Sequence, residues 1–286
     1  MIHEDNNHSF HIRLVPEEKG FHLKLSELYN YRDLVVLLTK KSFAVTYQQT
    51  VLGPLWIIFQ PILSSLIYLF VFGHIAEIGT AGIPHILFYF VSSALWEIFS
   101  FSLLSNASTF VNNSNLFSKV YFPRLAVPVS NMFVSLLKFC IQMIIIAGLM
   151  VYFLAGGMIS PHWTWYPVLP LIFLQISLSG MSAGILLSSL TTKYRDLSHL
   201  VNIGVSFFMY ASPVVYPLSE IPEGPMKYLM KINPVSEPLE LIRLIMFGKG
   251  EFDLFYYLGS LIITILMFLI STVVFNRVER TFADTV

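Results

Sequence analysis

The chain has 286 residues, of which 55% are hydrophobic and only 12% are charged. Soluble domains carry roughly a quarter charged residues, so water is not the main solvent for this chain. The 17 lysine and arginine residues balance the 17 aspartate and glutamate residues. The chain therefore has no net positive charge that would favour binding to nucleic acid. The single cysteine, Cys140, excludes a disulfide within the chain. One membrane domain is the simplest interpretation.

Residues 1–24 form a polar tail that lacks the apolar core and cleavage site of a secretory signal. Residues 25–48 then predict an amphipathic helix with one broad apolar face. That face carries Leu25, Leu28, Tyr29, Val35, Val36, Leu38 and Phe43. We expect this helix to lie in the interface of the cytoplasmic leaflet, either as a simple anchor or in contact with anionic lipid head groups.

Long apolar segments occupy most of the remaining chain. A bilayer core of about 30 Å needs roughly 20 apolar residues in a helix. Six segments meet this requirement, at about 54–75, 83–104, 129–154, 166–190, 197–215 and 254–275. The fifth carries Asn202 and Ser206 and ends at Pro213, so its length depends on turns near both interfaces. We predict an all-α membrane protein with six transmembrane helices, within a membrane domain at 49–280.

Basic residues are concentrated in alternate connections. They precede the first segment and follow the second, fourth and sixth, whereas residues 76–82 and 156–165 contain none. Short cytoplasmic loops retain positive charge, so we expect both termini, including the tail at 281–286, to lie in the cytoplasm.

The longest connection, residues 217–253, carries basic and acidic residues together. Two apolar stretches within it, 226–232 and 238–247, are too short to cross a bilayer and are separated by Asn233 and Pro234. We predict re-entrant outer helices between spans 5 and 6. The alternative is an amphipathic loop that lies on the membrane surface.

No catalytic motif stands out along the chain. The sequence has no phosphate-binding Gly-x-x-x-x-Gly-Lys-Ser/Thr loop, no His-Glu-x-x-His zinc pair and no Gly-x-Ser-x-Gly elbow. We therefore expect a chain that is not an enzyme, with no catalytic residue, no metal and no cofactor of its own.

Ionisable groups within apolar segments are the strongest functional signal from the residues alone. Glu97 lies in the middle of the second segment and Lys138 about a third of the way into the third. Burying such a group in hydrocarbon costs several kcal/mol unless it faces water or a partner. The two either form a pair or line a hydrated cavity. With them as channel candidates we group five aromatic residues, Trp56, Phe59, Tyr89, Trp96 and Phe99.

Small residues recur every four positions in the fourth segment, at Gly180, Gly184 and Ser188. This pattern lets helix backbones approach closely, within one subunit or across a dimer.

Four ordered blocks resemble the ABC-2 type polysaccharide export permeases over about residues 30–280. The first is YQQTVLGPLW at 47–56, with Gln60-Pro61 and Phe72-Gly73 after it. The others are NLFSKVYFPR at 115–124, YRDLSHL at 194–200, and SPVVYP at 212–217 with Asn233-Pro234. Members of that family export lipid-linked O-antigen, capsule or teichoic acid polymers across the bacterial inner membrane.

The resemblance implies a homodimer of the permease with two separate ABC ATPase subunits, which bind ATP and Mg²⁺. It also implies that residues 112–119 form the main coupling helix and that the second inner loop supports the contact. The coupling residues are Asn112, Asn115, Leu116, Phe117, Lys119, Tyr194, Arg195 and Asp196. Lys40, Lys41 and Arg124 are candidates for the lipid diphosphate, although the uncharged residues 42–46 depart from the family pattern.

Other functions remain open. An ABC-2 exporter of drugs or small molecules would share the fold and differ in cargo. An ion-coupled secondary transporter would use Glu97 and Lys138, but such folds show repeated halves and no internal repeat is visible here. A membrane glycosyltransferase lacks support from any acidic cluster at a membrane edge.

Overall fold

The computed structural model describes residues 25–113, 116–117, 122–194 and 196–285. Within these ranges every regular element is a helix. The long elements are α2 (Arg32–Tyr47), α3 (Trp56–Tyr68), α4 (His85–Ala107), α7 (Ala126–Ala155), α8 (Leu169–Lys193), α9 (Leu197–Tyr210), α11 (Ser236–Phe247) and α12 (Leu254–Thr285). The short ones are α1 (Leu25–Asn30), η1 (Gly53–Leu55), η2 (Leu69–Ile75), α5 (Thr109–Asn112), η3 (Trp163–Val168), η4 (Leu218–Glu220) and α10 (Pro225–Ile232).

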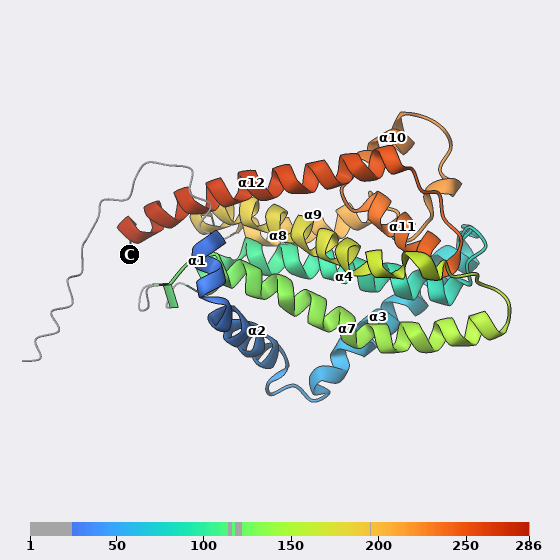
Figure 1. Ribbon diagram of the computed structural model, residues 1–286, viewed down its shortest axis with the longest axis horizontal. Coiled ribbons are helices and arrows are strands. Elements are labelled where there is room, and N and C mark those ends of the chain that lie inside the picture. The colour runs from blue at the N-terminus through green and yellow to red at the C-terminus, as the bar shows by residue number, and fades with distance from the viewer. Residues whose placement is uncertain (1–24, 114–115, 118–121, 195, 286) are drawn as a thin grey trace, which may run out of the picture.

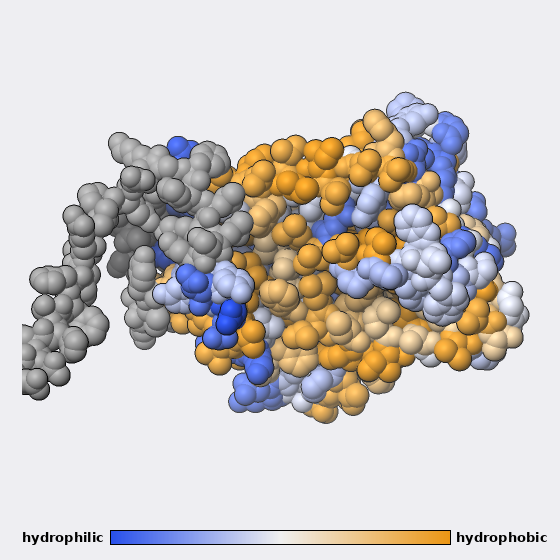
Figure 2. Space-filling model, viewed as in Figure 1, coloured by the Kyte–Doolittle hydropathy of each residue, from blue (hydrophilic) through white to orange (hydrophobic). Residues whose placement is uncertain are grey.

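Five helices of the described residues are long and apolar enough to cross a membrane. They are Gly53–Ile75, His85–Ala107, Ala126–Ala155, Trp163–Thr192 and Leu254–Arg277. Figure 1 shows them as a bundle, with α1, α2 and the C-terminal end of α12 at one end and α10 and α11 at the other. An apolar belt lies between more hydrophilic ends on the face in Figure 2. The prediction of an all-α, multi-pass membrane protein is confirmed.

The fifth predicted segment differs from the expectation, because the helix α9 ends at Tyr210 instead of continuing to 215. Its 14 residues rise about 21 Å at about 1.5 Å per residue, less than the about 30 Å of a bilayer core. The chain then turns through Ser212 and Pro213 into buried Val214 and Val215. Proline cannot donate the hydrogen bond that would continue the helix.

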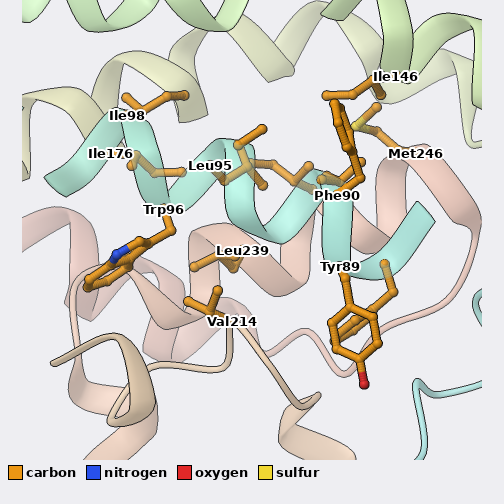
Figure 3. Packing of buried hydrophobic residues seen from close by; sticks show 14 of the residues in the cluster. Tyr89, Phe90, Leu95, Trp96, Ile98, Ile146, Ile176, Val214, Leu239 and Met246 are labelled. Carbon is orange, nitrogen blue, oxygen red and sulfur yellow. The ribbon is translucent and has the colours of Figure 1, made fainter. Parts of the chain in front are cut away.

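Helix α4 is the centre of the bundle. It is buried on nearly all sides, as expected for a helix that is apolar all round, and it packs against α3, α7, α8 and α9. Figure 3 shows Phe90 directed toward Ile146 and Met246, whereas Tyr89 and Trp96 project on the other side of the helix. Residues 89 and 96 are seven positions apart, or about two helical turns.

The small residues of α8 make its contact with α4 unusually close. A Cβ built on Gly180 would overlap the carbonyl oxygen of Phe99, and one on Gly184 would overlap that of Leu103. Nearby, Ser102 Oγ donates a hydrogen bond of 2.9 Å to the carbonyl oxygen of Ser177. The close approach predicted from the small-residue pattern therefore occurs within the subunit.

The predicted helix at 25–48 is divided by a turn at Tyr31 into α1 and α2. Helix α2 packs against α7, and its buried residues Val35 and Leu38 join a second apolar cluster with Phe110 and Phe275. Val36 and Leu37 remain exposed on another side. The helix is thus amphipathic, with one apolar side covered by protein and another left open.

The connection at 217–253 contains two helices of opposite character. Helix α11 is buried along nearly its whole length and contacts α8, α10, α12 and η3. Helix α10 buries Lys227 and Lys231 and exposes an apolar side. The exposed residues are Met226, Tyr228, Leu229 and Ile232. Because other helices of the protein cover α11, this helix differs from a loop that lies free on a surface.

Candidate functional site

A groove with polar walls lies between α3, α4 and α9 and has a volume of about 530 Å³. Each helix contributes residues three or four positions apart, the spacing that places side chains on one helical face. Helix α3 provides Gln60, Pro61, Ser64 and Tyr68; α4 provides Ser93, Trp96, Glu97, Ser100 and Leu104; and α9 provides Asn202, Ile203, Val205, Ser206, Met209 and Tyr210. Polar side chains therefore gather in the middle of an apolar bundle. We call this the polar groove.

The carboxylate of Glu97 is the charged group in the wall of the polar groove. Lys138 Nζ lies 3.3 Å from Glu97 Oε1, and Gln142 Nε2 donates a hydrogen bond of 2.7 Å to Oε2. Gln142 Nε2 also donates to the carbonyl oxygen of Ile57 at 3.0 Å. Both partners come from α7, behind the groove. The structure therefore contains the Glu97–Lys138 pair that the sequence left as one of two alternatives.

Aromatic rings surround the ammonium group of Lys138. Its Nζ lies 4.0 Å from the ring centroid of Phe101 and 5.8 Å from that of Tyr47. Such cation–π contacts stabilise a cation more strongly where water is scarce. Lys138 is 8% exposed, so the rings and the carboxylate replace its hydration. Tyr47 belongs to the first block of the family resemblance, and its neighbour here is Lys138.

A second groove, lined almost entirely by apolar residues, has a volume of about 540 Å³. It lies on another side of α9, against α4, α8 and α12, and Val205 lines both grooves. The rings of Trp96, Phe99 and Phe208 contact one another between the two grooves, with centroids 5.2 to 6.0 Å apart. The apolar groove is a hollow beside the polar one.

The structure brings only some of the predicted channel residues to the polar groove. Trp96 and Glu97 line it, and Lys138 holds Glu97 from behind. Phe99 lines the apolar groove instead. The remaining three candidates do not line either groove, because Tyr89 is fully buried and Trp56 and Phe59 are exposed on α3. Their role in a channel stays a prediction.

Sequence reasoning missed the polar residues that α3 and α9 contribute. Gln60, Ser64, Asn202 and Ser206 interrupt apolar segments, which was the available signal. By themselves, Asn202 and Ser206 indicate only a weak fifth segment, and the polar side chains of Gln60 and Ser64 carry no prediction of a groove. A single chain position cannot reveal that three helices turn their polar faces toward one another.

The predicted coupling residues that the structure describes lie at one end of the bundle. Asn112 ends α5, which contacts α8, and Tyr194 follows the last residue of α8. Thr191 Oγ1 donates a hydrogen bond of 2.5 Å to the carbonyl oxygen of Ala107, which joins the ends of α8 and α4. Asn112, Tyr194 and Asp196 are exposed.

Two other coupling residues are less accessible. Phe117 is buried against Phe110 and Phe122, and Leu116 packs partly buried against the same cluster. Asn115, Lys119 and Arg195 lie outside the described residues.

The basic residues proposed for a lipid diphosphate occupy two elements. Lys40 and Lys41 are exposed on α2. Arg124 is half-buried, with its guanidinium 5.6 Å from the ring centroid of Phe117. They belong to the same end of the bundle as α5, because α2 and Phe117 share one apolar cluster.

No group of three or more histidine, cysteine, aspartate and glutamate residues that could hold a metal ion occurs among the residues that the structure describes.

Comparison with known proteins places these features in a family. The family model described as ABC-2 type transporter matches residues 33–247. The O-antigen export system permease protein RfbA of Klebsiella pneumoniae is 29% identical over 256 residues, which cover 88% of this chain and 94% of the relative. The protein of the same name from Myxococcus xanthus is 26% identical over 263 residues, covering 91% of this chain and 98% of the relative.

Proposed function

Because this chain belongs to the ABC-2 type transporter family, we propose that it is the transmembrane subunit of an ATP-driven exporter of a lipid-linked polysaccharide, O-antigen in particular. The observation that carries the proposal is the polar groove, which Glu97, Asn202 and Trp96 line inside an apolar bundle. Two relatives that align with nearly their whole length are named O-antigen export permeases. A glycan needs polar and aromatic walls, because its rings present hydroxyl groups and C–H faces.

We further propose six membrane crossings, with both termini in the cytoplasm of the bacterial inner membrane. Helix α9 and the turn after it complete the fifth crossing. The buried turn is supported by side chains, because Asn233 Nδ2 donates to Ser212 Oγ at 2.8 Å and Arg243 Nη2 donates to the carbonyl oxygen of Pro213 at 2.5 Å. Non-helical backbone is tolerated at membrane depth where protein satisfies it.

We also propose that α10 and α11 are re-entrant, so that they enter the membrane from the outer side without crossing it. The exposed apolar side of α10, with Met226, Leu229 and Ile232, suits contact with lipid, and Lys227 and Lys231 turn inward to Glu251 at 3.0 and 3.1 Å. Cysteines placed at Lys41 and Met158 in a Cys140→Ser background test the orientation. A membrane-impermeant maleimide applied outside the cell should label position 158 and not position 41. The reverse result contradicts the arrangement.

The energy source in this proposal is a pair of ABC ATPase subunits bound to a homodimer of this chain. ATP and Mg²⁺ would bind those partners. The exposed positions Asn112, Tyr194 and Asp196 at one end of the bundle support this contact. Closure of the ATPases would then displace the adjoining helix ends and advance the glycan.

The transport path can be tested by filling the groove. Ser206 lines the polar groove, and the next residue on α9, Phe207, is exposed outside it. Ser206→Trp should abolish polysaccharide at the cell surface in a strain that lacks the native gene, because the indole obstructs the path. Phe207→Trp is the matched control and should export normally. Normal export by Ser206→Trp would reject the polar groove as the path.

Deletion of the gene for this chain tests which class of cargo the transporter exports. Loss of surface polysaccharide, with intracellular accumulation of the lipid-linked glycan, supports the proposal. Unchanged surface polysaccharide with sensitivity to small hydrophobic compounds would instead support the small-molecule exporter, which shares the fold.

A further inference from the structure

The Glu97 carboxylate lies between buried side chains of α7 and the polar groove. Its side chain is 17% exposed, and the side chain of Lys138, which is 10% exposed, approaches from α7. Gln142 is 1% exposed. Of these three residues, only Glu97 is part of the polar groove lining. The carboxylate is therefore supported from the buried side and open toward the groove.

The support leaves acceptor capacity unused. An ionised carboxylate offers about four lone-pair sites. Lys138 approaches Oε1, and Gln142 donates to Oε2. About two sites remain by this count, one on each oxygen. A pair of neighbouring hydroxyl groups on a sugar ring presents two donors at a spacing that suits both oxygens.

The other groups near Glu97 fit the same ligand. Trp96, the preceding residue on α4, also lines the groove, and Gln60 and Asn202 line it from α3 and α9. Apolar pockets with a few convergent polar groups are the usual form of a binding site. We propose that Glu97 is a sugar-binding residue, which accepts hydrogen bonds from vicinal hydroxyl groups of the glycan, and that Lys138 and Gln142 are positioning residues that hold it. This inference rests on the proposed export function and names a contact within it.

A purely structural role for the Glu97–Lys138 pair predicts a different result from sugar binding, so an experiment can separate these two roles. Glu97→Gln alone leaves Lys138 without its carboxylate, which harms the fold in either case. The double variant Glu97→Gln/Lys138→Met removes both charges. If the pair is only structural, this variant should restore export. If Glu97 binds sugar, the variant should assemble with the ATPase and still export poorly.

The measurement uses the complete complex of permease and ATPase in proteoliposomes. The probe is the lipid-linked glycan extracted from a strain that lacks the permease gene. The double variant should raise the glycolipid concentration for half-maximal stimulation of ATP hydrolysis about tenfold, as expected for loss of one hydrogen bond to a charged group. Glu77→Gln, at an exposed carboxylate outside the groove, is the control and should match the wild type.

A second measurement uses the wild-type complex and does not depend on folding of a variant. A membrane-permeant carbodiimide modifies accessible carboxyl groups, and mass spectrometry follows the peptide that contains Glu97. The glycolipid should protect this residue, and the same lipid without its glycan should not. Absence of protection overturns the inference, as does a double variant with wild-type half-saturation. If the wild-type complex neither exports nor responds to the glycolipid, the proposed function itself fails, which is a distinguishable result.

Discussion

Arg243 Nη1 donates to Glu240 Oε1 at 2.7 Å, and these two side chains on α11 are 1% and 0% exposed. The second nitrogen, Nη2, donates to Ser92 Oγ at 2.7 Å and so connects α11 to α4. Arg243 also stacks over the ring of Phe88 at 4.0 Å. Glu240 in turn accepts from the backbone N–H of Leu218 at 3.0 Å. One buried ion pair thus joins α11 and the backbone at Leu218 to the central helix α4.

Removing one member of this pair should be severely destabilising. Arg243→Met leaves the Glu240 carboxylate buried without its cation, at a cost of about 3–5 kcal/mol. The double variant Arg243→Met/Glu240→Leu should recover much of this loss. Thermal unfolding of the purified protein in detergent compares them. An Arg243→Met variant as stable as the wild type would show that the pair does not hold α11 against α4.

The contact between α4 and α8 should reject larger residues at its glycines. Gly184→Ala places a methyl group against the backbone of Leu103, and overpacking of this kind costs about 1–3 kcal/mol. Gly148→Ala on α7 is the matched control, since its Cβ would meet open space. That substitution should leave the melting temperature unchanged or slightly higher, because alanine favours a helix by up to about 1 kcal/mol over glycine. Equal effects at both sites would contradict the close packing.

A pH dependence is expected from Glu237 on α11. Burial raises the pKa of its carboxyl to about 7, against lowering by the backbone N–H of Asp253 and by Lys231, with Glu240 and Asp253 raising it further. Because the folded-state pKa lies above the usual 4.5, the associated stability is complete below about pH 4.5. It is lost as pH rises through about 7, by ~3 kcal/mol. Melting temperature measured from pH 5 to 8 should fall in the wild type and fall less in Glu237→Gln.

A second carboxylate in the same connection has the opposite sign. Burial raises the pKa of Glu251, but hydrogen bonds from Lys227 and Lys231 outweigh this effect and lower it below 4.5. Its contribution to stability is present above about pH 4.5 and is lost as pH falls through the lowered value. Glu251→Gln should therefore reduce stability at pH 6 and 7, and its difference from the wild type should shrink progressively as the pH falls below 4.5. An equal loss at all these values would contradict the ionic origin.

The proposed ATPase contact should depend on Asp196 without affecting the fold. Asp196 precedes α9 and makes no side-chain capping hydrogen bond, so Asp196→Lys should lower the melting temperature only slightly, through the helix dipole, at a cost of about 0.3–1 kcal/mol. Co-purification of the ATPase and surface polysaccharide should both fall. Asp33→Lys, at an exposed acidic residue of α2, is the control for charge reversal. Intact assembly and export with Asp196→Lys would remove this loop from the coupling model.

The long apolar helices could be predicted because their physical requirement is local. An uninterrupted apolar stretch of about 20 residues has few stable forms other than a spanning helix, as α4 and α7 show. The end of α9 could not be predicted in the same way. The turn after Tyr210 is held by Asn233 and Arg243, which lie more than 20 positions away in the sequence.

The candidate site also has a part that could be predicted from the sequence and a part that could not. Charges in apolar segments are visible in the sequence, so Glu97 and Lys138 could be selected and their pairing raised. Gln142 could not be assigned to them, because its contact with Glu97 depends on how far α7 is rotated against α4. The polar groove required the relative rotation of three helices, which composition does not determine.

Helix α9 has the polar groove on one side and the apolar groove on another. The end of α9 at Tyr210 is held by the hydrogen bonds that Asn233 makes to Ala211 and Ser212, and Val205 lies between the two grooves. A tilt of α9 about that held end would widen the polar groove and narrow the apolar one, so one movement of a short helix would change the two volumes in opposite directions.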